Sequence, residues 1–167
     1  MSHNPIPRRG LLAIAMMLEI AAEPGATPVY ALRSTGMSQD SNEQMVRQLR
    51  NAGLLAGVRG PGGGVRIATL ASSITLGQIV SAVVEPDKPL DQSDPFARAA
   101  SHITRSMCYA LHNVLDSTTL ESALMDARKA GIIKPRQPRQ PPAPEPAKPK
   151  TKIKMPAKPA SVFNFGG

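Results

Sequence analysis

Residues 36–66 constrain the fold of this chain more strongly than any other stretch of its sequence. They read GMSQDSNEQMVRQLRNAGLLAGVRGPGGGVR, which contains a glycine turn, a polar helix, a short strand, a glycine-rich loop and a second strand. Ser38 can cap the helix, because its side-chain oxygen can accept from an amide of the first turn, and Gly53 can end it. This order predicts the second half of a winged helix-turn-helix.

The predicted helix has one apolar and one polar face. Met45, Leu49 and Ala52 are separated by four and three residues, a spacing that marks the buried stripe of a helix. Polar side chains lie outside this stripe: Gln39, Asp40, Glu43, Gln44, Arg47 and Arg50. A helix divided in this way can seat one face on a core and present the other to a partner.

The outward polar face, together with Ser38 at its start, is assigned to DNA contact because it suits the major groove. Phosphates repel an acid such as Glu43, but its carboxylate can accept a hydrogen bond from cytosine N4 at the base edge. Arg47 and Arg50 are better suited to phosphates, which position a protein without specifying sequence. The alternative is an ordinary solvated helix face, on which Glu43 and Arg47 form an ion pair four residues apart.

Residues 59–64, the wing, have the sequence RGPGGG. They lack the Lys-Ser/Thr ending of a phosphate-binding loop, and a strand follows them instead of a helix. We expect this basic turn to contact DNA. There the negative potential of a narrow minor groove would attract Arg59. A plain hairpin turn is the alternative. The residues assigned to DNA contact here are Arg59, Gly60, Pro61, Gly62, Gly63, Gly64 and Arg66.

Two helices are predicted ahead of this stretch. Residues 9–23 are apolar on nearly every side of a helix, which predicts burial by the chain's own core and by a second subunit. Arg8 and Arg9 before this apolar run also outline a signal peptide. Glu19 interrupts the run, however, which favours a buried first helix. Residues 28–35 are predicted to form a short second helix.

Further caps predict the helices that follow the hairpin. Thr75 can cap a helix that continues to about Val84. Thr118 and Glu121 have the spacing of a capping box, which would open a last helix ending at Gly131. These signals predict a mainly α fold with one small β-hairpin.

A longer helix is predicted from Pro95, since proline suits the first turn of a helix. Along it, apolar residues alternate between spacings of four and three, which predicts a narrow apolar seam for packing against another helix. We assign this seam to a dimer interface, formed by Phe96, Ala100, Ile103, Met107, Ala110 and Val114.

Charge and proline divide the chain. Residues 1–133 carry 12 Lys and Arg against 11 Asp and Glu, whereas residues 134–167 carry 8 against 1 and contain nine of the 17 prolines. Such a basic, proline-rich tail cannot form a helix or a central strand. The predicted organisation is a winged helix-turn-helix domain at 1–84, an acidic loop at 85–94, dimerisation helices at 95–131 and a disordered tail at 132–167.

No cluster of residues predicts catalysis, a cofactor or a metal site. Cys108 is the single cysteine, which fits a reducing compartment and therefore a cytoplasmic, nucleoid-associated protein. We expect it to be a small buried hydrophobe, with a redox switch as the alternative. His102 and His112 are ten residues apart, which is not the spacing of metal ligands on one helix face.

Several motifs resemble one bacterial family. NAGLLAGVRGPGGGVRIA, the Glu43–Gln44 pair and ASSITLGQIVSAV resemble the winged helix-turn-helix regulators that include IscR, NsrR and CymR. The resemblance covers residues 8–84, and residues 95–131 by helix pattern. It implies a homodimer held by the long helix, with two recognition helices in successive major grooves and two wings in the minor groove.

The resemblance also implies roles for single residues. It assigns Glu43 and Gln44 to base edges, Arg59 and the wing glycines to the minor groove, and Arg8 and Arg9 to phosphates.

Two departures from the family pattern matter. Ser41 and Asn42 replace a Tyr-Leu pair near the inner side of the recognition helix, which implies that the helix is less firmly seated or rotated. Cluster-binding members carry three cysteines before and at the start of the long helix, whereas residues 85–106 of this chain contain none. Without thiolates an iron–sulfur cluster cannot form, so cluster sensing is rejected.

The sequence thus predicts a homodimeric regulator that binds a palindromic double-stranded DNA operator and represses by promoter occlusion. Two alternatives stay open. One is an architectural or interaction protein, whose winged helix binds a protein and whose tail binds DNA nonspecifically. The other is a thiol switch through Cys108. The end of the tail, SVFNFGG, could also serve as a docking peptide for a protein partner.

Overall fold

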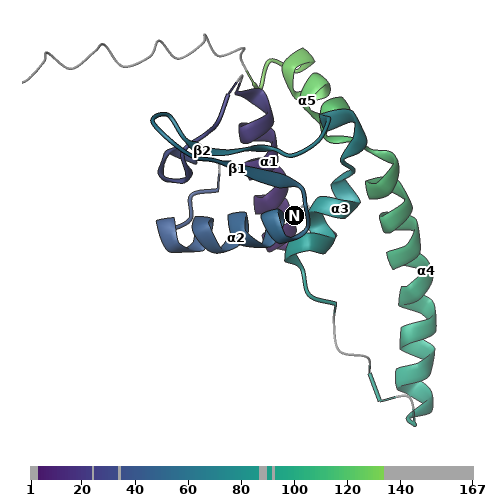
Figure 1. Ribbon diagram of the computed structural model, residues 1–167. Coiled ribbons are helices and arrows are strands. Elements are labelled where there is room, and N and C mark those ends of the chain that lie inside the picture. Colours follow the sequence, from purple (N-terminus) through teal and green to yellow (C-terminus); the bar gives the residue numbers. More distant parts are fainter. Residues whose placement is uncertain (1–3, 24, 34, 87–89, 92, 134–167) are drawn as a thin grey trace, which may run out of the picture.

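A computed structural model describes residues 4–133, except 24, 34, 87–89 and 92 (Figure 1). The predicted basic tail lies outside the described residues from residue 134 onward. The described elements, in chain order, are α1 (Arg8–Ala22), the 3-10 turn η1 (Val29–Ala31), α2 (Gln39–Asn51), β1 (Leu55–Val58), β2 (Gly64–Ile67), the 3-10 turn η2 (Ala71–Ser73), α3 (Leu76–Val83), α4 (Pro95–Ser117) and α5 (Leu120–Lys129).

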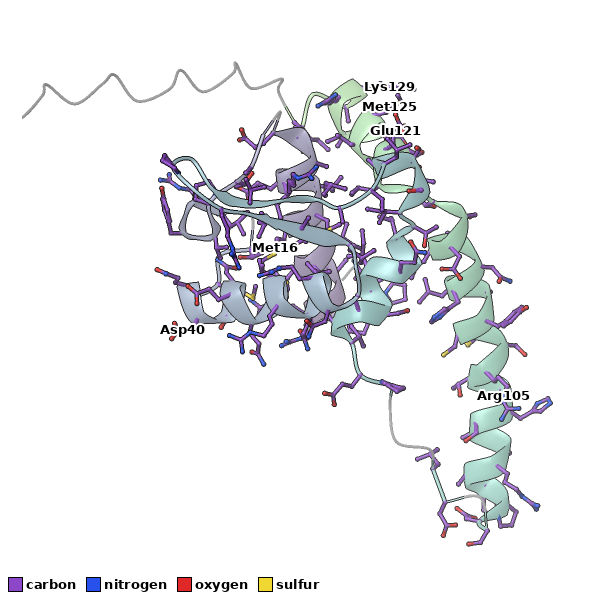
Figure 2. The ribbon with its side chains drawn as sticks, viewed as in Figure 1. Met16, Asp40, Arg105, Glu121, Met125 and Lys129 are labelled. Atoms are coloured by element: carbon purple, nitrogen blue, oxygen red, sulfur yellow. The ribbon has the colours of Figure 1, made fainter. Side chains whose placement is uncertain are left out.

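Helix α1 forms the centre of the core. Ala13, Met16, Met17 and Ile20 are at most 1% exposed, and α1 contacts α3, α5 and β2. Figure 2 shows Met16 enclosed among these elements. The apolar character of α1 on most sides is therefore explained within one chain. No helix in the described ranges is both long and apolar enough to cross a membrane.

The β-hairpin is short and antiparallel. Leu55 pairs with Ile67 and Val58 with Gly64, so the two strands register fully around the glycine-rich turn. Thr27 adds a bridge on the far side of β2, where its amide and carbonyl exchange hydrogen bonds with Val65 at 2.8 and 2.9 Å. This bridge ties the hairpin to the segment that follows α1. The predicted hairpin, and with it the mainly α winged-helix fold, is confirmed.

The predicted second helix at 28–35 is wrong, because the residues described in that range form a single turn, η1. Leu32 is already extended, and the Arg33 amide donates to both carboxylate oxygens of Glu19 at 3.1 and 3.2 Å. An amide held by a side chain of α1 cannot continue a helix. Glu19, which interrupts the apolar run of α1, thus fixes the backbone conformation of the segment before α2.

Two local predictions also need correction. Ala52 is exposed, because α2 ends at Asn51 and Ala52 is its C-cap, followed by Gly53 in a left-handed conformation with φ of 75°. The last helix is capped by Thr119, whose side chain accepts from the Ser122 amide at 3.1 Å. The box predicted from Thr118 and Glu121 is therefore wrong, because the cap lies one residue later and Ser122 occupies the position that a capping box requires to be Glu or Gln.

Helix α4 leaves the rest of the molecule along most of its length (Figure 1). Asp94 caps it, and its C-terminal end is held where Leu76 donates to the Thr118 carbonyl at 2.9 Å and Leu120 to that of Ile74 at 2.8 Å. Of the α4 residues, all of which the structure describes, only Leu115 is buried. The N-terminal part of α4 consequently projects beyond the core.

Candidate nucleic-acid interface

The N-terminus of α2 is capped as predicted. The Ser38 side chain accepts from the Ser41 amide at 3.3 Å, and Asp40 lies in the first turn, where its charge favours the helix dipole. Figure 2 shows Asp40 at this end of α2, directed away from the core. The cap fixes where the helix begins and therefore which residues its outer face presents.

The two faces of α2 are those that the sequence predicts, except that Ala52 does not belong to the inner face and two further residues do. Met45 and Leu49 are 1% and 0% exposed, and Asn42 and Val46 are also buried. Ser41, which we placed near the inner side, is exposed instead, and its hydroxyl accepts from that of Ser38 at 2.9 Å. All six predicted outward residues are exposed: Gln39, Asp40, Glu43, Gln44, Arg47 and Arg50.

Glu43 is held by a neighbour on the same face. Its carboxylate accepts from the Gln39 side-chain amide at 3.0 Å, so its observed partner is Gln39 and not Arg47. Both side chains are exposed, and neither is required by the core. The carboxylate therefore remains accessible on the outer surface of α2, oriented by a second polar group.

The backbone of the wing is accessible to a ligand because its glycines carry no side chains. Gly60 and Gly62 have φ of 102° and 76°, and the Gly63 amide closes the turn on the Gly60 carbonyl at 2.8 Å. A Cβ on Gly64 would collide with the Thr27 carbonyl, because Thr27 bridges the adjacent strand residue. Residues 59–62 are exposed, which leaves Arg59 and the tip of the turn free to approach a ligand closely.

A groove of about 470 Å³ separates α2 from the hairpin. In Figure 1 the hairpin runs alongside α2, with its turn at the outer end. The charged residues of the lining are Glu43, Arg47 and Arg50 from α2 and Arg59 from the wing. Three cations against one acid make the groove positive, which is the sign needed to attract phosphates.

Arg50 also contacts the hairpin. An ideal Cβ on Gly57 would lie 3.4 Å from the Arg50 guanidinium carbon, so this planar group lies against the backbone of β1. Because Gly57 has no side chain, the arginine can bridge from α2 to the strand. Arg50 therefore links the two walls of the groove and supplies charge to it.

The other predicted basic residues lie apart from the groove. Arg9 donates from Nε to the Val83 carbonyl at 3.0 Å and from Nη2 to the Gln48 side chain at 2.8 Å, which joins α1 to α2 and α3. Arg8 is exposed at the start of α1. Arg66 lines a second hollow beside α1 and is not part of the groove lining.

Sequence reasoning placed Asn42 near the inner side of α2 but missed its partner Thr35 and the exposed Tyr30. Asn42 is 3% exposed and forms a buried hydrogen bond with Thr35. Tyr30 is 77% exposed on η1, the element that precedes α2. The polar Asn42 on the apolar side of α2 was a signal that a buried hydrogen-bond partner such as Thr35 exists. Nothing in the sequence pattern indicates the exposure of Tyr30.

The six seam residues of α4 lie exposed along the helix. The larger ones are strongly exposed: Phe96 83%, Ile103 65%, Met107 68% and Val114 62%. Cys108 is exposed too, so its predicted burial is wrong. The physical reason is that α4 meets the core only near its C-terminal end, at Leu115, and no other described part of the chain covers Cys108.

Comparison with known proteins identifies relatives over most of the chain. Residues 6–126 match the family Rrf2, described as "Iron-dependent Transcriptional regulator". The transcriptional regulator IscR of Vibrio atlanticus is 34% identical over 130 residues, covering 75% of this chain and 73% of that protein. The regulator CymR of Bacillus subtilis is 32% identical over 119 residues, covering 70% and 86%.

Solved structures agree with this fold. The structure of CymR, the global cysteine regulator of B. subtilis, aligns with a TM-score of 0.59 and 29% identity, covering 74% of this chain and 98% of that one. IscR of T. potens aligns with a TM-score of 0.60 and 25% identity, covering 80% and 93%. Both share the arrangement of helices and hairpin described above.

The iron in the family description does not fit the donor set of this chain. Iron–sulfur clusters are held by several thiolates, and Cys108 is the only cysteine in the sequence. Among the residues that the structure describes, no three His, Cys, Asp or Glu side chains are grouped to hold a metal ion. The match therefore concerns the fold and the DNA-binding class, since both close relatives are regulators of transcription. The chain belongs to the Rrf2 family of transcriptional regulators, which are DNA-binding proteins with a winged helix.

Proposed function

We propose that this regulator binds a specific double-stranded DNA sequence as a homodimer and represses transcription by occluding a promoter. The observation that carries the proposal is the positive groove between α2 and the wing, whose walls are linked by Arg50. A polar helix of this exposure suits the major groove, and a basic glycine turn beside it suits the adjacent minor groove.

The groove residues divide into two roles. Glu43, oriented by Gln39, accepts from a base edge, and Gln44 beside it donates or accepts at the next base. Arg47, Arg50 and Arg59 neutralise phosphates, which gives affinity without sequence preference. Arg59 lies at the base of the wing, where the negative potential of an A·T-rich minor groove adds to its binding.

The apolar seam of α4 supports a dimer. Four large apolar side chains on one helix are more than 60% exposed in the single chain, and a second copy of the same helix would cover them. A twofold axis would then present two α2 helices to the same side of a duplex. Half-sites about one helical turn apart, roughly 34–36 Å, are expected for such a pair.

Fluorescence anisotropy tests this function with duplexes that the chain itself enriches from a random pool. The full chain should prefer the enriched duplex over a scrambled one at physiological salt. Equal affinity for both duplexes would refute sequence-specific binding. Alanine at Arg47 should weaken both duplexes alike and reduce the salt slope by about one, whereas alanine at Glu43 should reduce discrimination by roughly 1–3 kcal/mol.

The architectural alternative is separated by removing residues 134–167. Sequence-specific binding through the groove predicts that the shortened chain keeps its preference, with a smaller salt slope because 8 Lys and Arg are lost. Nonspecific binding through the tail predicts that DNA affinity disappears with it.

The thiol-switch alternative is favoured by one observation, the exposure of Cys108 on α4. It requires that an oxidant changes the affinity for the enriched duplex and that Cys108→Ser abolishes the change. Binding that is indifferent to the oxidant would eliminate this alternative.

A further inference from the structure

The strongest unexplained feature of the interface is a buried polar pair beneath α2. The Thr35 hydroxyl donates to Asn42 Oδ1 at 2.8 Å, and the two residues are 7% and 3% exposed. The same Thr35 oxygen accepts from the Met37 amide at 3.3 Å. One hydroxyl thus organises the turn before α2 and joins it to the first full turn of the helix.

In the first turn of α2, residues 39–42, the one buried residue is polar: it is Asn42. The buried residues of α2 are Asn42, Met45, Val46 and Leu49, so the apolar ones all lie in its later turns. The preceding element η1 contacts α2, and Met37 just before the helix packs on the core, so apolar contacts flank this first turn without lying in it. Within this first turn, Asn42 is therefore the residue whose buried side chain attaches α2 to the preceding segment.

A hydrogen bond restricts the relative orientation of two groups more narrowly than an apolar contact does. Apolar burial is non-directional, whereas the strength of a hydrogen bond falls steeply with distance and angle. Gln39 and Glu43 lie on the outer face of the same turns, with Glu43 adjacent to Asn42 in sequence. A rotation of the start of α2 would displace both residues relative to a base edge.

The pair is also difficult to explain by stability alone. Two apolar residues of the same shape are often as stable as a buried hydrogen-bonded pair, while removing one partner leaves the other unsatisfied at a cost. A buried polar pair at this position is thus better explained by the geometry that it specifies.

We infer that the Thr35–Asn42 hydrogen bond is a positioning element, which sets the orientation of the N-terminal half of α2 and thereby its discrimination between DNA sequences. Neither residue touches DNA. The inference rests on the proposed DNA-binding function and adds to it a determinant of specificity that lies inside the protein.

The test compares discrimination with stability in a double-mutant cycle. Asn42→Leu leaves the Thr35 hydroxyl without its acceptor, and Thr35→Val leaves Asn42 Oδ1 and the Met37 amide without their partner, so both variants should have a lower melting temperature. The double variant replaces the pair with apolar side chains and should recover most of it. Its preference for the enriched over the scrambled duplex should nevertheless fall roughly tenfold, which is the loss of one base contact. Its nonspecific affinity and salt slope should stay unchanged, because the arginines remain.

Two further variants complete the design. Thr35→Ser keeps the hydroxyl and should keep the discrimination of the unmodified chain. Met45→Leu changes the apolar stripe at nearly constant volume and should alter the melting temperature without altering discrimination. If the double variant does not fold, Thr35→Val alone is measured below its melting temperature, where discrimination should again be lost.

The outcomes are distinguishable. Full discrimination in the folded double variant, or in folded Thr35→Val, would overturn the inference and leave the pair a structural one. Absence of discrimination in the unmodified chain would instead refute the proposed function. Loss in the double variant together with retention in Thr35→Ser and Met45→Leu would support the positioning role.

Discussion

Replacing Met107 by alanine should weaken the dimer strongly, whereas replacing Tyr109 should not. The two side chains are 68% and 70% exposed in the single chain, so each offers similar surface to a partner. They are two positions apart in α4 and therefore point to opposite faces of the helix. Only Met107 belongs to the apolar seam, which makes Tyr109 a matched control.

The size of the effect follows from the surface to be covered. Burying a side chain of this kind completely is worth about 1.5–3 kcal/mol, and two-thirds of that is roughly 1–2 kcal/mol. A symmetric dimer contains the residue twice, so the loss is roughly 2–4 kcal/mol. At about 1.4 kcal/mol per tenfold, the dimer dissociation constant should rise roughly 30- to 1000-fold.

Sedimentation equilibrium without DNA measures this constant directly. Circular dichroism should show unchanged helix content for both variants, because neither side chain is buried in the chain's own core. Equal weakening by Met107→Ala and Tyr109→Ala, or weakening by Tyr109→Ala alone, would refute the assignment of the seam. The same result would remove the basis for expecting a palindromic operator.

Three other variants test single elements. Ser38→Ala removes the cap of α2 and should lower the free energy of unfolding by about 1 kcal/mol, as measured by urea denaturation. Gly64→Ala should disrupt the hairpin, because its Cβ would collide with the Thr27 carbonyl, and should reduce the affinity for DNA. Met107→Cys combined with Cys108→Ser should cross-link two chains on oxidation, whereas the native Cys108, off the seam, should not.

For each of these variants, one result would contradict the prediction. Unchanged stability of Ser38→Ala would mean that water replaces the cap. Normal affinity of Gly64→Ala would separate the wing from DNA binding. Efficient cross-linking through native Cys108 would place the dimer contact on a different face of α4.

Much of the fold could be predicted because its signals are local. Ser38, Thr75 and Pro95 each mark a helix start by their own chemistry, and each lies where the structure begins a helix. The glycine-rich wing between two apolar strands predicted the hairpin in the same way. The outward face of α2 followed from periodicity once its start was known.

The features that were missed depend on residues distant in the sequence. Glu19 ends the helix predicted at 28–35 by binding an amide 14 positions away, and Arg9 bonds to residues 39 and 74 positions away. The exposure of Cys108 depends on the direction in which α4 leaves the core. No local pattern encodes such contacts, and they decide which basic residues remain free for DNA.

Selection of bound duplexes from a random pool by the full chain tests the central claim most directly. Our account predicts enrichment of a palindrome with half-sites about one helical turn apart, flanked by A·T-rich segments where the wings bind. A pool that remains random after repeated selection, with binding governed by salt alone, would contradict it.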